Sequence, residues 1–91
     1  MFYVYILYSL KSKNFYYGYT EDLRKRLGEH NNGFSKATAP FRPWTLVFYA
    51  AFQTKKLAKD FERYIKSGSG KALAYKRLLN SVALKNDKTG L

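Results

Sequence analysis

Three short segments rich in aromatic and β-branched residues predict three β-strands, at residues 2–9, 15–19 and 44–52. Successive side chains of a strand point to opposite faces, and the first segment is bulky on both of them. One face would carry Tyr3, Tyr5 and Leu7, and the other Phe2, Val4, Ile6 and Tyr8. We therefore expect this strand to be covered on both sides, and the polar turn at residues 10–14 to join it to the second strand as a hairpin.

Polar capping residues followed by apolar positions at helical spacing predict a first helix after the hairpin. Thr20 is the expected N-cap, with Glu21 and Asp22 in the first turn, where carboxylates interact favourably with the helix dipole. The helix is expected to run to about Asn31 and to end before Gly33.

The second half of the chain predicts a loop and two more helices. Residues 33–43 contain both prolines of the chain and predict a polar, basic loop. Thr54 is placed to cap a helix at about 55–67, and the Ser-Gly-Ser-Gly run at 67–70 separates it from a third helix at about 71–79. The order β-β-α-β-α-α predicts an α/β fold of the α+β kind, with a small central three-stranded, mainly antiparallel sheet flanked by helices.

The length of 91 residues fits a single domain. We assign residues 1–80 to this domain and expect the weakly patterned residues 81–91 to form a flexible C-terminal tail. The apolar start of the chain has no basic leader and is interrupted by tyrosines, so it predicts a strand rather than a signal peptide. No stretch is long enough to span a bilayer, and the expected location is the cytoplasm.

The chain is strongly basic, since 17 Lys and Arg residues oppose 6 Asp and Glu residues and give a net charge of +11. Such a charge favours a polyanionic partner, because counterions held by the polyanion are released on binding. Nucleic acid fits better than an anionic membrane surface, which usually attracts a helix with a free apolar face. Many ribosomal and other small soluble proteins share this balance, so charge alone does not decide the partner.

The first helix places two polar residues where apolar ones are expected. Leu23 and Leu27 define its buried stripe, and Arg26 and His30 fall on the same stripe at spacings of three, four and seven. We expect both side chains at the edge of the core, against the sheet. The alternative is that Arg26 extends to water and His30 simply ends the helix.

The second helix offers one carboxylate beside its apolar face. That face would be formed by Leu57, Ala58, Phe61 and Ile65. With no cysteine and one histidine, the chain cannot build a thiolate or histidine metal site, so a metal would need a carboxylate. Glu62 is the natural candidate, and a single carboxylate suits Mg²⁺, which keeps most of its waters and takes other ligands from substrate phosphate. The alternative is a salt bridge between Glu62 and a nearby Lys or Arg.

Two of the nine tyrosines are candidates for chemistry. Tyr5 and Tyr16 lie on adjacent strands of the expected hairpin and could both project toward the first helix. A phenol is a poor base at neutral pH, but a nearby cation lowers its pKa. Gly18, inside the second strand, suggests that another group approaches the backbone there. The alternative for the tyrosines is ordinary cross-strand packing.

These residues, in this order and spacing, resemble the GIY-YIG nucleases. Tyr-Val-Tyr at residues 3–5 stands where the family has Gly-Ile-Tyr, and Tyr-Tyr-Gly at 16–18 stands where it has Tyr-Ile-Gly. Arg26 and Glu62 follow at the family's helical positions, and the resemblance covers about residues 2–79. The chain is most similar to the small stand-alone bacterial members. It is more distantly similar to the N-terminal nuclease domain of the excision-repair protein that makes the 3′ incision.

The resemblance implies a DNA endonuclease with a role in DNA repair that uses one Mg²⁺ or Mn²⁺ ion held mainly by Glu62. Tyr5 and Tyr16 would position or deprotonate a water, Arg26 would bind the phosphate, and His30 would orient a tyrosine or assist proton transfer. Gly18 would let the substrate approach the backbone. The cations Lys13, Lys36 and Arg42 are candidates for binding the nucleic-acid backbone. DNA is expected as the partner rather than RNA, with little sequence preference.

The chain departs from the family pattern at three positions. Tyr3 replaces the first Gly of the motif, Tyr19 stands where many relatives have Lys, and Ala74 stands where an Asn often follows the Glu. A second hypothesis is therefore a non-catalytic, basic nucleic-acid-binding module on the same fold. A third is a basic ribosome-associated protein, against which the position of Glu62 argues.

Overall fold

The computed structural model describes residues 1–74 and residue 76. The last part of the predicted third helix and the tail expected at residues 81–91 lie outside the described residues, as does the domain boundary placed at residue 80. Within the described part of the chain, no helix combines the length and the apolar character needed to cross a membrane.

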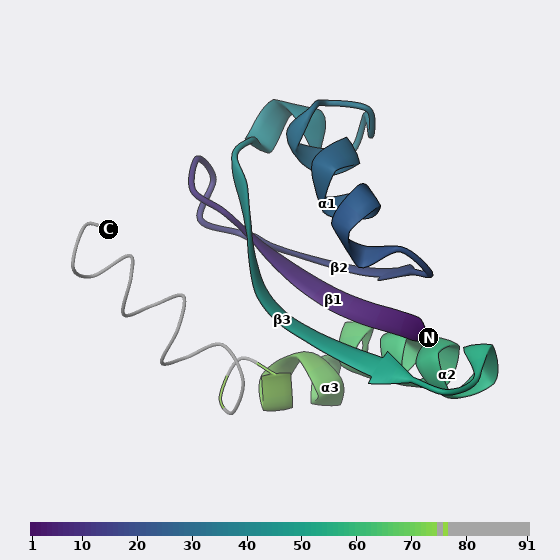
Figure 1. The fold of residues 1–91 in the computed structure, drawn as a ribbon. Helices are drawn as coiled ribbons and strands as arrows, with labels where there is room; N and C mark the ends of the chain where they lie inside the picture. Colours follow the sequence, from purple (N-terminus) through teal and green to yellow (C-terminus); the bar gives the residue numbers. More distant parts are fainter. Residues whose placement is uncertain (75, 77–91) are drawn as a thin grey trace.

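The three predicted strands are present and form one antiparallel sheet (Figure 1). β1 (Phe2–Ser9) lies in the centre, between β2 (Phe15–Thr20) and β3 (Trp44–Phe52). Tyr5 of β1 pairs directly with Gly18 of β2. The predicted fold class, α+β with the order β-β-α-β-α-α, is confirmed. β2 and β3 are thus the edge strands of the sheet.

Helices cover both faces of the sheet, as the two apolar faces of the first strand predict. α1 (Leu23–Asn31) lies on one face, and α2 (Lys55–Lys66) and α3 (Gly68–Leu73) lie on the other (Figure 1). The core on the α1 side contains Tyr5, Leu7 and Trp44, with the partly buried Tyr16, Leu23, Leu27 and Leu46 around them. The core on the α2 side contains Val4, Ile6, Ala58, Ile65 and Ala74. Removal of this apolar surface from water holds the layers together.

The segment between α1 and β3 contains a short 3-10 helix, η1 (Ala39–Phe41), and hydrogen bonds hold it against the rest of the domain. The Asn31 side chain accepts a hydrogen bond from the Trp44 backbone nitrogen at 2.7 Å and donates one to the Trp44 carbonyl at 3.0 Å. The Trp44 indole donates to the Thr38 carbonyl at 2.9 Å. These bonds fix Thr38 beside the end of α1, where His30 lies.

The first helix begins at Leu23, later than predicted. Its N-cap is Asp22, not Thr20, because the Asp22 side chain accepts a hydrogen bond from the Lys25 nitrogen at 3.1 Å. The Thr20 hydroxyl instead accepts from the Asp22 nitrogen at 3.1 Å, in the turn that precedes the helix. Glu21 and Asp22 therefore lie before the first turn, and the prediction of an acidic first turn was wrong. The Asp22 carboxylate still lies at the positive end of the helix dipole.

The third helix begins at Gly68 and not at Lys71, because Ser67 both ends α2 and caps α3. The Ser67 backbone nitrogen donates to the Tyr64 carbonyl at 3.0 Å, and its hydroxyl accepts from the Gly70 nitrogen at 3.2 Å. A Cβ at Gly70 would overlap the Tyr64 carbonyl, so the close joint between the two helices requires glycine there.

The apolar face of α2 is narrower than predicted. Ala58 and Ile65 are fully buried and Phe61 is partly buried. Leu57 is 53% exposed, so its assignment to this face was wrong. Leu57 lies at the side of the stripe that turns away from the sheet, and helical spacing alone does not show which side of a stripe is covered.

Candidate active site

The Tyr5 phenol is the centre of the candidate site, on the α1 side of the sheet. Tyr5 is 2% exposed and faces Gly18 across the β1–β2 ladder. A Cβ at Gly18 would overlap the Tyr5 Cζ and Oη atoms and lie 2.9 Å from Cε1. The close approach that Gly18 predicts is therefore made by the Tyr5 side chain itself. Without a side chain at Gly18, the phenol reaches the edge strand β2.

His30 is fully buried, and both nitrogens of its ring have partners. Nε2 lies 2.9 Å from the Tyr5 hydroxyl, and Nδ1 lies 2.8 Å from the Thr38 hydroxyl. The Tyr16 ring contacts the imidazole in an edge-on arrangement, with 5.1 Å between ring centroids. Burial lowers the pKa of His30, and the nearby Arg26 guanidinium acts in the same direction. His30 is thus a neutral group that links α1 to the Tyr5 phenol. The alternative, in which His30 simply ends the helix, does not describe these contacts.

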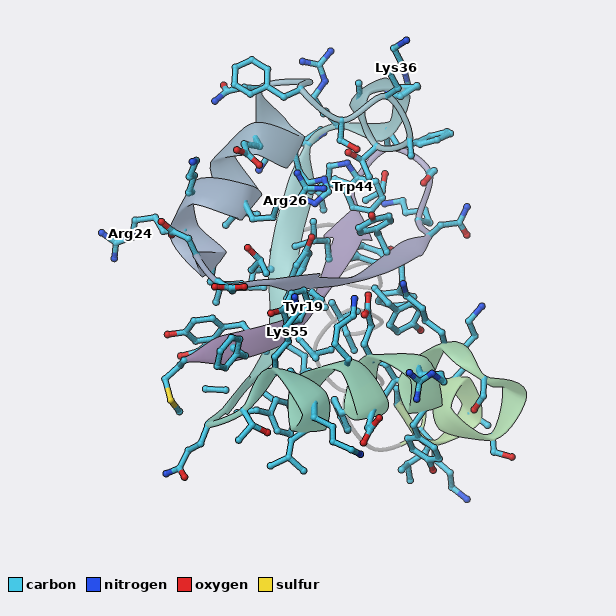
Figure 2. All side chains as sticks on the ribbon, turned by 90° about the vertical axis from the view of Figure 1, so that its right-hand side faces the viewer. Tyr19, Arg24, Arg26, Lys36, Trp44 and Lys55 are labelled. Carbon is cyan, nitrogen blue, oxygen red and sulfur yellow. The ribbon has the colours of Figure 1, made fainter. Side chains whose placement is uncertain are left out.

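Arg26 points from α1 toward the sheet, whereas Arg24 extends outward into solvent (Figure 2). The Arg26 side chain is 35% exposed and forms an ion pair with Glu29 at 2.9 Å. The bond to Glu29 raises the pKa of Arg26, and the adjacent Tyr5 hydroxyl contributes to the same shift. Arg26 therefore places a permanent positive charge beside the phenol while remaining open to solvent.

Burial raises the pKa of Tyr5 to about 12. The Arg26 guanidinium opposes this shift, while the Tyr16 phenol and the Glu62 carboxylate add to it. Tyr5 is consequently a neutral phenol at physiological pH. It can relay a proton to a partner, but it does not rest as a phenolate.

Glu62 lies on α2, in the layer on the opposite face of the sheet, and 12% of its side chain is exposed. Its carboxylate forms ion pairs with Lys59 at 3.1 Å and with Lys66 at 2.9 Å. Burial acts to raise the pKa of Glu62, but the hydrogen bonds from the two lysines hold it below its ordinary value. The salt bridge that was the alternative to metal binding is therefore present, and it keeps Glu62 ionised.

The edge strand β2 borders both layers, because Tyr19 packs against the α2-side core and Tyr16 against the α1-side core. Figure 2 shows Tyr19 on the side of β2 that faces α2. The Lys59 ammonium group lies 4.6 Å from the centroid of the Tyr19 ring, so the ion pair with Glu62 lies along this strand. Glu62 acts electrostatically on the hydroxyls of both Tyr19 and Tyr5.

Two open hollows border these side chains. One, of about 370 Å³, lies between the end of β2 and α1 and is lined by Tyr19, Arg26 and Glu29 among others. The other, of about 170 Å³, is lined by residues that include Tyr16, Thr38 and Trp44. A ligand that enters the first hollow would contact the Arg26 guanidinium directly.

Glu62 is the candidate ligand for a metal ion at this site. The described residues contain no group of three or more His, Asp or Glu side chains that could hold an ion by themselves. An ion at Glu62 would therefore take most of its ligands from water and from a substrate phosphate, a coordination that Mg²⁺ accepts. The ionised, partly exposed carboxylate fits this requirement once the lysines move aside.

The sequence model of the GIY-YIG catalytic domain matches residues 1–77. The chain belongs to the GIY-YIG family. This match includes both tyrosine motifs, α1 and α2, and so covers all of the candidate site residues.

Similar proteins come from several bacteria. The UPF0213 protein CPE1444 of Clostridium perfringens is 43% identical over 67 residues, which cover 72% of this chain and 71% of that protein. The UPF0213 protein YazA of Bacillus subtilis is 44% identical over 57 residues, which cover 62% of this chain and 58% of that protein. The solution NMR structure of the UPF0213 protein BH0048 from Bacillus halodurans has a TM-score of 0.54 at 32% identity, and the match covers 94% of this chain and 96% of that one.

The structure accommodates the departures from the GIY-YIG pattern. Tyr3 lies in the regular part of β1 and contacts the ring of Tyr49, with 6.3 Å between centroids, so this position does not need glycine. Tyr19 stands where many family members have Lys, and the Lys59 ammonium lies over its ring. Ala74 is 1% exposed and packs in the α2-side core, where it contributes no polar group.

The three cations predicted to contact nucleic acid lie outside this cluster. Lys13 is in the β1–β2 turn with a positive φ of 64°, and Lys36 and Arg42 are exposed in the loop between α1 and β3. Lys36 projects from the end of the molecule formed by that loop (Figure 2). Arg42 donates to the Ala39 carbonyl at 2.8 Å, and its guanidinium covers Gly33.

Sequence reasoning missed two contacts of the GIY-YIG site. One is the ion pair of Arg26 with Glu29, which lies three residues later, a spacing at which side chains meet on a helix. Thr38 had no signal of its own, because it lies in a loop without periodicity. Its role could be inferred only by asking which group satisfies the second nitrogen of a buried His30.

Proposed function

We propose that this protein is a metal-dependent endonuclease that hydrolyses phosphodiester bonds of DNA with little sequence preference, using one Mg²⁺ or Mn²⁺ ion. Membership of the GIY-YIG family supports a nuclease-type domain and a nucleic-acid substrate. The observation that carries the proposal is the contact of the buried Tyr5 hydroxyl with His30, next to the Arg26 guanidinium and within the electrostatic influence of Glu62.

Arg26 would bind the phosphate that is attacked. It is a fixed cation at the wall of an open hollow, and its present partner Glu29 can be replaced by a phosphate oxygen. A guanidinium offers several donors in a plane, which suits the charge that spreads over the phosphate oxygens during the reaction.

Tyr5 and His30 would remove a proton from the attacking water. A phenol with a pKa of about 12 is not ionised at neutral pH, so it is not a base by itself. It can, however, take a proton from water while it passes its own proton to His30 Nε2. His30 can accept this proton because burial keeps it neutral. The hydroxide then forms the new bond to phosphorus as the bond to the leaving oxygen breaks. Tyr16, in contact with His30, would position the water.

Glu62 would hold the metal ion, whose charge would offset the negative charge on the reacting phosphate. Its two lysine partners would then be free to contact neighbouring phosphates of the DNA backbone. The exposed Lys13, Lys36 and Arg42 would extend this contact. Backbone contacts of this kind position a nucleic acid without reading its sequence, which fits the expected lack of base specificity.

The test is a cleavage panel of single-stranded, duplex, flapped and branched DNA, together with RNA, in Mg²⁺ or Mn²⁺. Glu62→Gln should reduce cleavage at least about a hundredfold, because metal stabilisation of a phosphoryl transfer contributes several kcal/mol. Asp60→Asn is the matched control: Asp60 pairs with Lys56 and Arg63 on the same helix but lies away from the site. Equal loss in both variants, or none in Glu62→Gln, would contradict the assignment of the metal to Glu62.

A non-catalytic nucleic-acid-binding module is the second candidate function. It is favoured by the double ion pair that already occupies Glu62 and by the apolar Ala74 in place of an Asn. This function predicts salt-sensitive DNA binding without cleavage of any substrate in the panel, in either metal.

A further inference from the structure

We propose that Thr38 is a positioning residue that holds His30 in the tautomer protonated at Nδ1, so that Nε2 is free to accept the proton of Tyr5. This inference rests on the proposed function for its chemical meaning, although the tautomer itself can be measured without any activity. Thr38 is 1% exposed, and its hydroxyl lies 2.8 Å from His30 Nδ1.

The hydrogen positions follow from what each partner of the imidazole can do. The guanidinium of Arg26 has only donors, so the Tyr5 oxygen that it contacts acts as an acceptor toward it. The single hydrogen of the Tyr5 hydroxyl is then available for Nε2 at 2.9 Å. A phenol is also a far stronger acid than an aliphatic alcohol, so the basic ring nitrogen is better matched to Tyr5 than to Thr38.

The other side of the ring supports the same assignment. The Thr38 hydroxyl donates to the carbonyl of Ser35, at 3.5 Å, and a carbonyl can only accept. With its one hydrogen directed there, the Thr38 oxygen accepts from a protonated Nδ1. The chain of donors therefore runs from Tyr5 to His30, from His30 to Thr38 and from Thr38 to Ser35.

Thr38 is itself held in place. Its carbonyl accepts a hydrogen bond from the Trp44 indole at 2.9 Å, and its backbone nitrogen donates to the Ser35 carbonyl at 3.2 Å. Trp44 is fixed in turn by the two hydrogen bonds with Asn31, the last residue of α1. The loop thus presents the Thr38 hydroxyl at a defined place beside the ring, rather than as a mobile surface group.

The tautomer decides whether the proton path works. When Tyr5 gives its proton to Nε2 and takes one from water, the ring becomes an imidazolium that still donates from Nδ1 to Thr38, so no bond on that side must change. In the opposite tautomer Nε2 already carries a proton and cannot accept another. Thr38 would therefore act through His30 without touching the substrate.

The experiment is nitrogen-15 NMR of the imidazole, which is unambiguous because the chain has one histidine. The wild type should show a pyrrole-type Nδ1 and a pyridine-type Nε2 at neutral pH. Thr38→Val should shift the equilibrium toward the Nε2-protonated form and slow cleavage about tenfold or more, as loss of a partner that orients a histidine does at metal sites. Thr38→Ser should restore both the tautomer and the rate. Thr45→Val, at an exposed position of β3, should change neither.

A wild-type ring protonated at Nε2 would overturn the proposal, as would a Thr38→Val variant that keeps the Nδ1-protonated form and full activity. If Thr38→Val does not fold, the wild-type spectrum still decides which tautomer is present. Thr38→Ser must then keep that tautomer, and loss of it would contradict the proposal. A wild type that cleaves nothing but shows the expected tautomer would remove the proposed function and leave the structural role of Thr38 standing.

Discussion

Tyr5 and Gly18 share one place in the sheet: the phenol of Tyr5 lies where a side chain at Gly18 would be. The two residues belong to the two tyrosine motifs of the GIY-YIG pattern, and they are direct partners in the β1–β2 ladder. The glycine of the second motif is therefore explained by the tyrosine of the first. It leaves room for the phenol to lie against β2 while its hydroxyl contacts His30.

Gly18→Ala should disturb the position of Tyr5 and destabilise the fold. The added Cβ would overlap the ring, and overpacking of this kind typically costs about 1–3 kcal/mol. Urea unfolding would measure the loss, and the cleavage rate should fall with it because the Tyr5 hydroxyl is displaced from His30.

Gly28→Ala is the matched control for that experiment. Gly28 lies in α1, and a Cβ there would meet nothing within 4 Å. Alanine is preferred to glycine inside a helix by roughly 0.5–1 kcal/mol, so this variant should be slightly more stable than the wild type. If Gly18→Ala were as stable and as active as Gly28→Ala, the fit between Tyr5 and Gly18 would not be the reason for the glycine.

Tyr5→Phe should lower both activity and stability. Loss of the hydroxyl removes the proton relay, and positioned acid–base groups contribute about 10²–10⁴-fold to rate. It also leaves Nε2 of the buried His30 without its partner, for which about 1–3 kcal/mol of unfolding free energy is expected to be lost.

Tyr49→Phe serves as the comparison for Tyr5→Phe, because Tyr49 lies on β3 and its side chain is 54% exposed. Removal of that hydroxyl should leave the rate and the urea midpoint close to the wild-type values. Should Tyr5→Phe cleave at the wild-type rate, Tyr5 would have a packing role only.

Much of this fold could be predicted because the pattern that specifies it is local. Alternating bulky residues defined β1 and its two covered faces, and a spacing of four residues put Arg26 and His30 on one side of α1. The meeting of His30 with Tyr5 follows once that helix is laid on the sheet. The absence of cysteine and the single histidine then singled out Glu62, which helical spacing placed at the edge of a stripe.

Several of the errors involve short polar side chains or neighbours distant in sequence, which local spacing does not specify. Asp22 displaced Thr20 as the cap because both can satisfy free backbone donors, and Ser67 capped a helix that glycine was expected to interrupt. Thr38 is fixed by Trp44 and by the ring of His30, and neither contact is encoded by local spacing. The burial of Thr38 therefore became visible only in three dimensions.

His30 should titrate below the ordinary histidine pKa of about 6.5, since burial and then Arg26 disfavour its charged form, while Glu29 partly opposes them. The Tyr5 phenol, which contacts the ring, carries no charge in this pH range because burial raises its pKa to about 12. A lowered pKa means that folding favours the neutral ring. The contribution of His30 to stability is therefore complete above the unfolded pKa and is lost as pH falls through the folded value.

Proton NMR of the single histidine would give this pKa, and urea unfolding from pH 7 downward would give the stability. Asp60 and Glu62, whose pKa values are also lowered, lose their contributions only at more acidic pH, below about 4.5, so the first decline belongs to His30. A His30→Gln variant should lack this early decline. A histidine pKa above the ordinary value would contradict the buried, neutral ring.

Glu29→Gln should strengthen binding of the substrate. Glu29 holds Arg26 by an ion pair at 2.9 Å, and a phosphate must compete with it for the guanidinium. Because the pair is partly exposed, its removal should change the unfolding free energy by only about 0–1 kcal/mol. The Kd for a DNA oligonucleotide in the absence of divalent metal should fall, while Arg26→Lys should raise it, since a lysine lacks the planar set of donors that matches a phosphate.

Asp60→Asn again provides the control for removal of one negative charge, because Asp60 pairs with other cations on α2. If Glu29→Gln and Asp60→Asn tighten binding equally, the effect is one of net charge, and the release of Arg26 would not be its cause.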